Sequence, residues 1–248
     1  MHADTNSLLI LDSVDSTNNY AMGIVRKGLA SHGNAYFAHE QTNGKGRRGK
    51  VWKTDKGKNI TLSIIVDPHF LAVTRQFQLS VAVSLSCLDL LKKYAGDEVK
   101  IKWPNDVFWN DRKAGGMLIE NVIKGNVWQW AVAGIGIDIN QTEFDVSNNF
   151  LPVSLKQITG KDFDVIELSR ELCCAVLNRI EELKTNGFEK MLTEYNKNLF
   201  KLNEKVKLKK GNIVFETTVK GVSSQGKLIT VNAIERQFGF DEVIWLRE

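Results

Sequence analysis

Residues 100–120 read KIKWPNDVFWNDRKAGGMLIE, a stretch in which ionisable and amide side chains alternate with large aromatic ones. Pro104 disfavours helix at the residue before it, and Asn-Asp pairs are common in tight turns. The stretch therefore predicts a strand, a turn at Asn105-Asp106, a short strand, a turn at Asn110-Asp111 and another strand. Such a hairpin would hold Lys113 on a rigid frame near the first turn. Two interpretations remain open from these residues alone: a functional site, or ordinary turns with a solvated lysine.

The charge of the chain is concentrated in one segment. The 248 residues are 43% hydrophobic, enough for a large domain with or without a small appendage, and carry a formal net charge of +4. Seven basic residues and one acid lie between Gly44 and Lys58, a segment called the basic loop below, so the rest of the chain is slightly negative. This distribution argues against a nucleic-acid partner and favours a local anion-binding site.

The basic loop begins GKGRRGK at Gly44, which matches the glycine spacing of the dinucleotide fingerprint and nearly that of the phosphate-binding P-loop. Both motifs need a helix directly after the glycines, because its amino end holds the phosphate. Residues 51–58 have no helical period, so both interpretations fail. What remains is a glycine-hinged cationic loop suited to close over a phosphate-bearing ligand, with Trp52 as a surface on which a base could stack. A merely solvated basic loop is the alternative.

Two further polar features lie at element ends. Residues 16–18, Ser-Thr-Asn, join a strand at 8–11 to a helix, where they would either cap the helix or hold a neutral polar ligand. A strand is predicted over 127–140. Its glycines, Gly134 and Gly136, predict either a close approach to a ligand, with Asp138 and Asn140 beside it, or a bulge without function.

The remaining pattern predicts an α+β chain. Strands are expected at 35–40 and 59–66, helices through 77–91, from Asp164 and over 188–199, and short strands from Asn203 onward. The last 46 residues suit a small β-barrel, so the predicted domains are 1–202 and 203–248.

The three cysteines, Cys87, Cys173 and Cys174, fall in apolar helical patterns without metal spacing. We interpret them as reduced core residues of a cytoplasmic protein. The first residues lack a signal-peptide pattern, and no segment reaches membrane-spanning length, so no membrane association is expected. The histidines His2, His32, His39 and His69 are scattered, so no metal site is predicted.

Taken together, residues 15–18, 44–49, 102–106, 113–116 and 134–136 resemble, in order and spacing, the motifs of the biotin protein ligases. The resemblance implies a mixed-sheet catalytic domain related to class II aminoacyl-tRNA synthetases, followed by an SH3-like barrel. Because the motifs begin almost at Met1, it implies the type without the amino-terminal DNA-binding domain. It also implies two substrates, biotin and ATP, with Mg2+ accompanying ATP, and a biotin carboxyl carrier protein as partner. The sequence leaves open whether the protein is a monomer or a homodimer.

The implied reaction has two steps. Biotin and ATP form biotinyl-5'-AMP, and a carrier lysine then takes the biotinyl group. Two anions must meet in the first step, and their repulsion needs cations between them.

By resemblance, Lys113 and Arg47 would be catalytic, and Asp106 would face the carrier lysine. The biotin site would comprise Ser16, Thr17, Asn18, Gln41, Lys45, Gly46, Arg47, Lys113 and Gly116. The nucleotide site would comprise Arg48, Lys50, Trp52, Asn105, Gly116 and Asp138. Two positions depart from the family pattern: Lys45 replaces an arginine, and Asp138 replaces an asparagine and would add a negative charge near phosphates.

Two rival functions remain. A lipoate or octanoate ligase or transferase of the same superfamily would share the fold and the lysine, but its acyl pocket has no need for the polar residues 16–18. A non-catalytic module that binds biotin or a nucleotide would not need Lys113.

Overall fold

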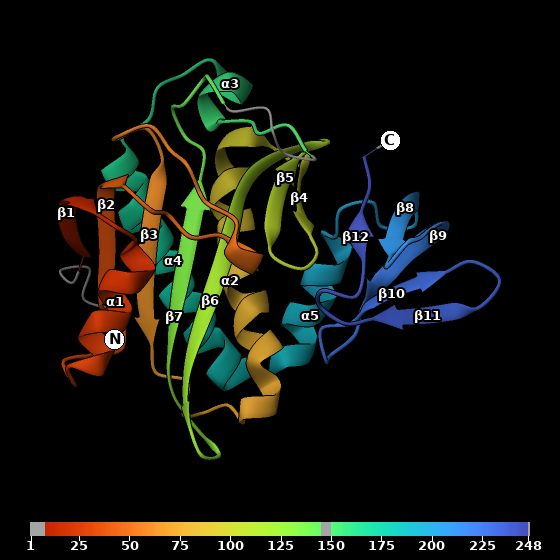
Figure 1. Ribbon diagram of the computed structural model, residues 1–248, viewed down its shortest axis with the longest axis horizontal. Coiled ribbons are helices and arrows are strands. Elements are labelled where there is room, and N and C mark those ends of the chain that lie inside the picture. The colour runs from red at the N-terminus through yellow and green to blue at the C-terminus, as the bar shows by residue number, and fades with distance from the viewer. Residues whose placement is uncertain (1–7, 145–149, 248) are drawn as a thin grey trace.

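A seven-stranded mixed sheet forms the centre of the larger part of the computed structural model, which describes residues 8–144 and 150–247 (Figure 1). Its strands are β1 (Leu8–Val14), β2 (Ala35–Gln41), β3 (Ile60–Val66), β4 (Val99–Lys102), β5 (Asp106–Trp109), β6 (Arg112–Lys124) and β7 (Val127–Ile137). Their spatial order is β1-β2-β3-β7-β6-β5-β4. β1 and β2 pair in parallel, and all other neighbours in this sheet are antiparallel.

Helices cover both faces of this sheet. Behind it in Figure 1 lie α2 (Gln76–Ala95) and α4 (Val165–Asn186), followed by α5 (Phe188–Lys197), while α1 (Thr17–Arg26) lies on the front face. Successive strand side chains point to opposite faces. Accordingly Ile64 belongs to the large core shared with α2 and α4, and Ile65 packs in the smaller cluster with Ala21 and Val25 of α1.

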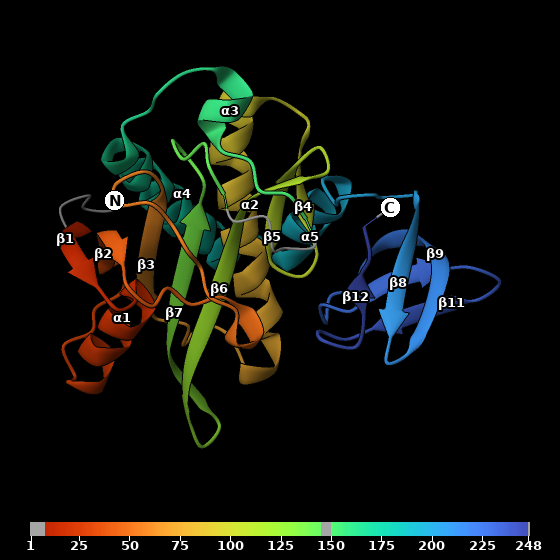
Figure 2. The same cartoon turned by 45° about the horizontal axis from the view of Figure 1, so that its top comes forward.

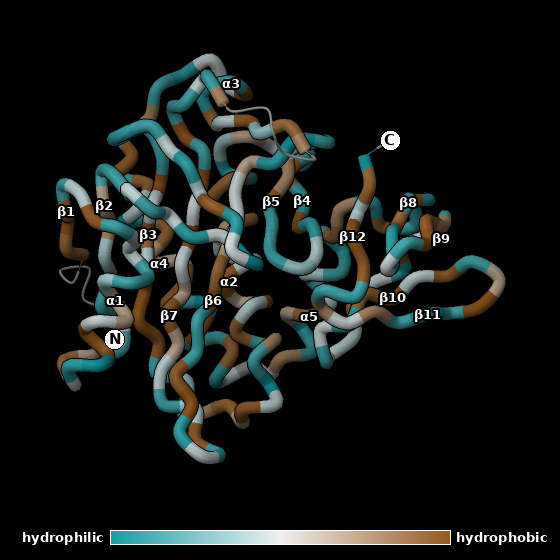
Figure 3. The backbone as a smooth tube through the Cα atoms, in the orientation of Figure 1, coloured by the Kyte–Doolittle hydropathy of each residue, from teal (hydrophilic) through white to brown (hydrophobic). Residues whose placement is uncertain are grey.

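The inner strand β3 is buried on both faces, because helices cover each of them, and it is mostly apolar, with Thr61 and Ser63 as its polar residues. All seven residues of β3 are buried. In Figure 3 the hydrophobic stretches of β3 and β7 lie next to each other, as their register requires. The long helix predicted through residues 77–91 is confirmed as α2, which is buried along much of its length.

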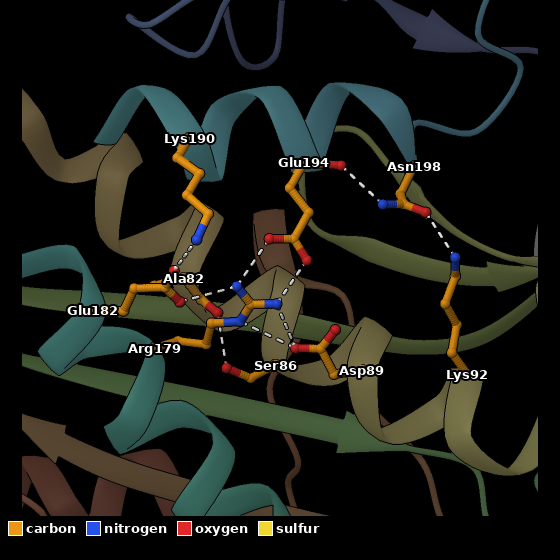
Figure 4. Close-up of polar contacts among 9 residues, drawn as sticks. All are labelled: Ala82, Ser86, Asp89, Lys92, Arg179, Glu182, Lys190, Glu194 and Asn198. Carbon is orange, nitrogen blue, oxygen red and sulfur yellow. Dashed lines mark hydrogen bonds and ion pairs between the residues drawn. The ribbon is translucent and has the colours of Figure 1, made fainter. Parts of the chain in front are cut away.

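An arginine in α4 links the three helices of the rear layer (Figure 4). Arg179 contacts Asp89 of α2 at 2.7 Å, Glu194 of α5 at 2.7 Å and Glu182 of α4 at 3.1 Å. The Arg179 side chain is only 16% exposed, so its charge is matched by these carboxylates rather than by solvent alone. The network fixes the helices that support the sheet from behind.

A second, antiparallel sheet follows in the chain and stands beside α5 (Figure 2). Its five strands are β8 (Lys205–Lys210), β9 (Ile213–Val222), β10 (Leu228–Val231), β11 (Glu235–Phe238) and β12 (Ile244–Trp245), in the order β11-β10-β9-β8-β12. We call it the C-terminal sheet. It touches the larger part directly, since Trp103 Nε1 donates a hydrogen bond of 2.9 Å to the carbonyl of Gly226.

Several predicted boundaries were wrong by a few residues. The strand predicted to end at Leu11 continues to Val14, and the one predicted to reach Asn140 ends at Ile137. Asn140 lies beyond the end of β7, and its side chain forms hydrogen bonds with the backbone of Phe163. The helix predicted over 188–199 ends at Lys197. The helix predicted from Asp164 is confirmed as α4, and the Asp164 carboxylate caps it by accepting from two of its backbone amides.

Three short elements were not predicted: α3 (Leu155–Thr159), which Ser154 and Gln157 start with a capping box, and the 3-10 turns η2 (Arg47–Gly49) and η3 (Val73–Arg75). Within residues 8–144 and 150–247, no helix has both the length and the apolar character needed to cross a membrane.

Candidate active site

The predicted hairpin is confirmed, and it brings Lys113 against Asp106. β4 and β5 meet at the turn before Asp106, and β5 returns into β6 with Phe108 paired to Lys113. Lys113 Nζ lies 2.7 Å from Asp106 Oδ1, and the lysine side chain is 30% exposed. Gly116 makes room for this pair, because a Cβ there would lie 3.0 Å from the carboxylate and 3.1 Å from the ammonium. A freely solvated Lys113 is therefore excluded.

Trp52 lies flat against the strand beside this pair. The Lys113 ammonium lies 5.6 Å from the centre of its ring, and a Cβ on Gly136 would come within 2.5 Å of the indole. Only glycine at this point of β7 permits that approach. The bulge interpretation of Gly136 is thus wrong. The glycine admits Trp52, whose Nε1 is buried without a hydrogen-bond partner among the described residues.

A buried polar cluster lies at the start of α1. Ser16, Thr17 and Asn18 are each no more than 3% exposed. Ser16 occupies the N-cap position, but its side chain makes no capping hydrogen bond. Gln41 Oε1 instead accepts from the backbone amide of Thr17 at 2.8 Å and from its hydroxyl at 3.1 Å. The capping interpretation is wrong for these side chains, because Ser16 makes no capping hydrogen bond and Thr17 and Asn18 bond Gln41 and Ser63 instead.

Two residues that the sequence did not single out complete this cluster. The Ser63 hydroxyl of β3 lies 2.6 Å from Asn18 Oδ1 and 2.8 Å from Thr17 Oγ1. Glu120 of β6 accepts from Asn18 Nδ2 at 2.8 Å. Ser63 could have been found as a polar side chain within an otherwise apolar stretch of strand. Glu120 gave no such signal, because its strand carries several other polar residues, such as the adjacent Asn121.

Gly134 explains how the cluster reaches the sheet. A Cβ on Gly134 would collide with the side-chain amide of Asn18, so the glycine lets Asn18 sit directly on β7. Lys45, at 3.5 Å from the other oxygen of Glu120, connects the cluster to the basic loop. A single ammonium can make this contact without the two-pronged geometry of an arginine.

The basic loop crosses in front of β7 and β6 (Figures 1 and 2). No helix follows its glycines, so the exclusion of the dinucleotide and P-loop motifs is confirmed. The loop is closed on itself by two backbone hydrogen bonds, from Gly46 N to the Lys50 carbonyl at 2.7 Å and from Trp52 N to the Gly44 carbonyl at 2.8 Å.

The two arginines of the basic loop, Arg47 and Arg48, differ in whether they contact the hairpin. Arg47 Nη1 lies 3.4 Å from Asn105 Oδ1 in the hairpin turn, so Arg47 joins the site around Lys113. Arg48 instead places Nε 2.6 Å from Asp241 of the C-terminal sheet region. Lys50 is exposed. The structure therefore brings Arg47, and not Arg48, to the hairpin.

Two buried ionisable groups flank the hairpin. Burial raises the pKa of Asp138 to about 8, against the attraction of Lys113, so the carboxyl is mostly neutral at pH 7. The negative charge expected at Asp138 is therefore largely absent at pH 7. Burial lowers the pKa of Lys102 to about 8, against the opposing effect of Asp106. The Lys102 ammonium lies over the rings of Phe108, Phe150 and Trp245, at 4.7–5.3 Å.

Comparisons with known proteins identify the family of this chain. Residues 10–138 match the profile described as the biotin/lipoate A/B protein ligase family. The chain is 30% identical over 237 residues to the "Biotin--[acetyl-CoA-carboxylase] ligase" of Paracoccus denitrificans, covering 92% of this chain and 95% of that protein. It is 30% identical over 228 residues to the "Bifunctional ligase/repressor BirA" of Escherichia coli, covering 91% and 70%.

A solved structure shows the same architecture. The biotin protein ligase from Aquifex aeolicus in complex with biotin and ATP superposes with a TM-score of 0.83 at 26% identity, covering 98% of this chain and 100% of that one. The α+β fold related to class II aminoacyl-tRNA synthetases is thereby confirmed. The chain belongs to the biotin/lipoate A/B protein ligase family.

Proposed function

We propose that this protein is a biotin ligase that activates biotin with ATP and transfers it to a lysine of a biotin carboxyl carrier protein. The proposal rests on one arrangement of residues. Lys113, Asp106 and Trp52 lie together at the hairpin. Arg47 of the basic loop contacts the same hairpin through Asn105. The arrangement offers cations on a rigid hairpin and on a loop that crosses in front of it.

In the first step a carboxylate oxygen of biotin attacks the α-phosphorus of ATP, and the bond to pyrophosphate breaks. Two unit charges of the same sign 4 Å apart repel by about 4 kcal/mol at a protein-surface dielectric. Lys113 would bridge the carboxylate and the α-phosphate by leaving Asp106, and Arg47 would close over both. Trp52 would offer its ring to adenine, while Asn105, Gly116 and Asp138 would line the nucleotide site and Arg48 and Lys50 would reach its phosphates.

In the second step the amine of a carrier lysine attacks the acyl carbon of biotinyl-5'-AMP, and AMP leaves. Asp106 would accept a hydrogen bond from that amine, since Lys113 would by then be engaged with the adenylate. The basic loop would keep water from the mixed anhydride until the carrier docks.

The polar cluster favours biotin over lipoate or octanoate. The Thr17 hydroxyl bonds Gln41 and Ser63, and the Asn18 amide is already oriented by Ser63 and Glu120. Oriented donors and acceptors suit the ureido ring of biotin, whereas an aliphatic acyl chain could form no hydrogen bond with them. Ser16, Lys45 and Gly46 would complete the biotin site from the helix start and the basic loop.

Magnesium would enter with ATP as a counter-ion of its phosphates. Among the described residues, no group of three or more histidine, cysteine, aspartate or glutamate side chains could hold a metal ion. Magnesium commonly binds to substrate phosphates with few protein ligands.

We also propose that residues 1–202 form the catalytic domain and 203–248 an SH3-like domain, and that the protein works in the reducing cytoplasm. The separate C-terminal sheet supports the division. Cys87, Cys173 and Cys174 are all free, although Cys174 is only half-buried and not the core residue we expected.

The proposal is tested by pyrophosphate release with ATP, magnesium and one acid at a time: biotin, lipoate or octanoate. We expect release with biotin alone, followed by labelling of a single lysine when a biotin carboxyl carrier domain is added. Pyrophosphate release with lipoate or octanoate equal to that with biotin would instead indicate a lipoate or octanoate ligase. Biotin binding without any pyrophosphate release would make it a binding module.

A further inference from the structure

A buried lysine that the proposed reaction does not use lies beside the Lys113–Asp106 pair. Lys102, the last residue of β4, is the strand partner of Asp106 in β5. Side chains of strand partners project to the same face of a sheet, with their Cβ atoms about 5 Å apart. Asp106 therefore has a lysine on each of the two strands that flank β5: Lys102 on β4, and Lys113 on β6, which contacts it at 2.7 Å.

Three aromatic rings enclose the Lys102 ammonium. The ring centres of Phe108, Phe150 and Trp245 lie 4.7–5.3 Å from Nζ, and the residue is only 6% exposed. The rings attract the cation, but they replace only part of the hydration that it loses on burial. Burial accordingly lowers its pKa to about 8, so the group is still mostly charged at pH 7. A charge in such surroundings acts on its neighbours more strongly than it would in water.

An apolar side chain would fill the space of Lys102 at a lower cost. Replacing buried ionic groups by apolar residues of similar volume is often neutral or stabilising. Methionine has nearly the length of lysine and packs well against aromatic rings. Packing alone therefore does not explain a lysine at this position, whereas a use for its charge does.

The charge of Lys102 acts on the groups of the site. Asp106 attracts the Lys102 ammonium, whereas Lys113 and Lys50 repel it. Two cations thus share one carboxylate, with Lys113 in contact and Lys102 enclosed by the rings. Repulsion between the two ammonium groups favours the release of Lys113 from Asp106. After that release Lys102 is still present to balance the carboxylate.

We propose that Lys102 is the counter-charge that stays with Asp106 while Lys113 moves to the biotin carboxylate and the α-phosphate. The inference rests on the proposed function, in which Lys113 leaves Asp106. Without Lys102, Asp106 would hold Lys113 more tightly and slow the first step. In the second step Lys102 stabilises the carboxylate that accepts a hydrogen bond from the carrier amine. Lys102 is a positioning residue, because it acts through Asp106.

The first test needs no substrate. The pKa of Lys102 is measured by NMR of its side chain in the full-length parent and in Asp106→Asn. We expect a pKa of about 8 in the parent. In Asp106→Asn we expect this pKa to fall by about 1 pH unit, because an attracting negative charge has been removed. An unchanged pKa of Lys102 would overturn its coupling to Asp106.

The second test is a double-mutant cycle on pyrophosphate release with biotin and ATP. Lys102→Met should lower kcat about 10-fold, within the range of coupling energies between neighbouring charges, and leave both KM values within about 2-fold of the parent. In the Asp106→Asn background the same substitution should have almost no further effect. Lys100→Met is the matched control, because Lys100 is half-buried on the same strand and the same face. We expect it to match the parent.

Three results would overturn the proposal in the kinetic and stability measurements. An equal loss of kcat in both backgrounds would do so, because a purely structural role of Lys102 does not depend on Asp106. An unchanged kcat in Lys102→Met would do so as well. Urea unfolding should show Lys102→Met to be at least as stable as the parent, and a large loss of stability would assign the lysine to packing. If the parent releases no pyrophosphate with biotin, the proposed function fails, while the pKa measurement still decides the coupling.

Discussion

Lys113 Nζ lies 2.7 Å from Asp106 Oδ1, across two neighbouring strands of one hairpin. The strand frame fixes both backbones, so the freedom left is in the two side chains. The Asp106 carboxylate holds the Lys113 ammonium at the position from which we propose that it contacts the reacting anions. In the proposed mechanism a substrate carboxylate or phosphate would replace Asp106 as the partner of Lys113.

Loss of Arg47 is expected to open the site after the first step. Arg47→Gly removes the guanidinium that contacts Asn105 and Asp241. Biotinyl-5'-AMP should then escape or hydrolyse faster, and activated biotin should reach lysines of bystander proteins. The measurement is the half-life of enzyme-bound adenylate together with labelling of serum albumin. Arg247→Gly, which removes an exposed arginine near the end of the chain, serves as control. Adenylate retained as long as in the parent would contradict the proposed closing role of the loop.

Replacing Ser63 is expected to weaken the binding of biotin and to leave the binding of ATP unchanged. Ser63→Ala removes the hydroxyl that orients Thr17 and Asn18, at a fully buried position. Leaving buried polar groups unpaired costs about 1–3 kcal/mol, so KM for biotin should rise about 10-fold or more. Ser86→Ala is the matched control, because Ser86 is equally buried but bonds the Ala82 carbonyl within α2. A biotin KM that changes equally in both variants would argue for general destabilisation.

The raised pKa of Asp138 predicts that nucleotide binding depends on pH. Its pKa of about 8 means that the carboxyl becomes charged as the pH rises through 8, beside Lys113 and close to the proposed phosphates. KM for ATP should therefore rise above pH 8 in the parent and stay flatter in Asp138→Asn, which cannot ionise. The measurement is KM for ATP from pH 6.5 to 9.5 in both proteins. Identical profiles would place Asp138 outside the nucleotide site.

The same group affects stability with a definite sign. The folded protein raises the pKa of Asp138 from 3.8 to about 8, so between these values the native state binds more protons than the unfolded chain. The free energy of unfolding contributed by this group falls as the pH rises through that window. Asp138→Asn should gain stability over the parent between pH 5 and 8, on the order of a few kcal/mol. Urea unfolding at several pH values measures it, and a constant difference would contradict the raised pKa.

The sequence predicted the parts of the site that are built locally. Pro104 and the two Asn-Asp turns determine a hairpin through backbone preferences, and Lys113 meets Asp106 only seven positions away. The glycines of β7 were also informative, because glycine inside a strand signals close approach. They indicated that something lies against the backbone. They did not reveal that Gly134 admits Asn18 and Gly136 admits Trp52.

Contacts between distant segments could not be predicted from the sequence. Glu120 meets Asn18 from 102 positions away, and Asp241 meets Arg47 from 194. Such pairs depend on the strand order of the sheet and on where the C-terminal sheet docks, neither of which has a local signature. The raised pKa of Asp138 likewise depends on burial, which its own neighbours in the chain do not reveal.

In the proposed mechanism Lys113 lowers the barrier to joining the two anions, biotin and ATP. The most direct measurement is single-turnover pyrophosphate release from biotin and ATP by Lys113→Ala, alongside biotin binding by calorimetry. Lys124→Ala, at the exposed end of the same strand, is the control. We expect Lys113→Ala to bind biotin within about 3-fold of the parent and to release pyrophosphate about 100- to 1,000-fold more slowly, the usual effect of removing one electrostatic contact to a transition state. Pyrophosphate release at a rate near that of the parent would contradict it.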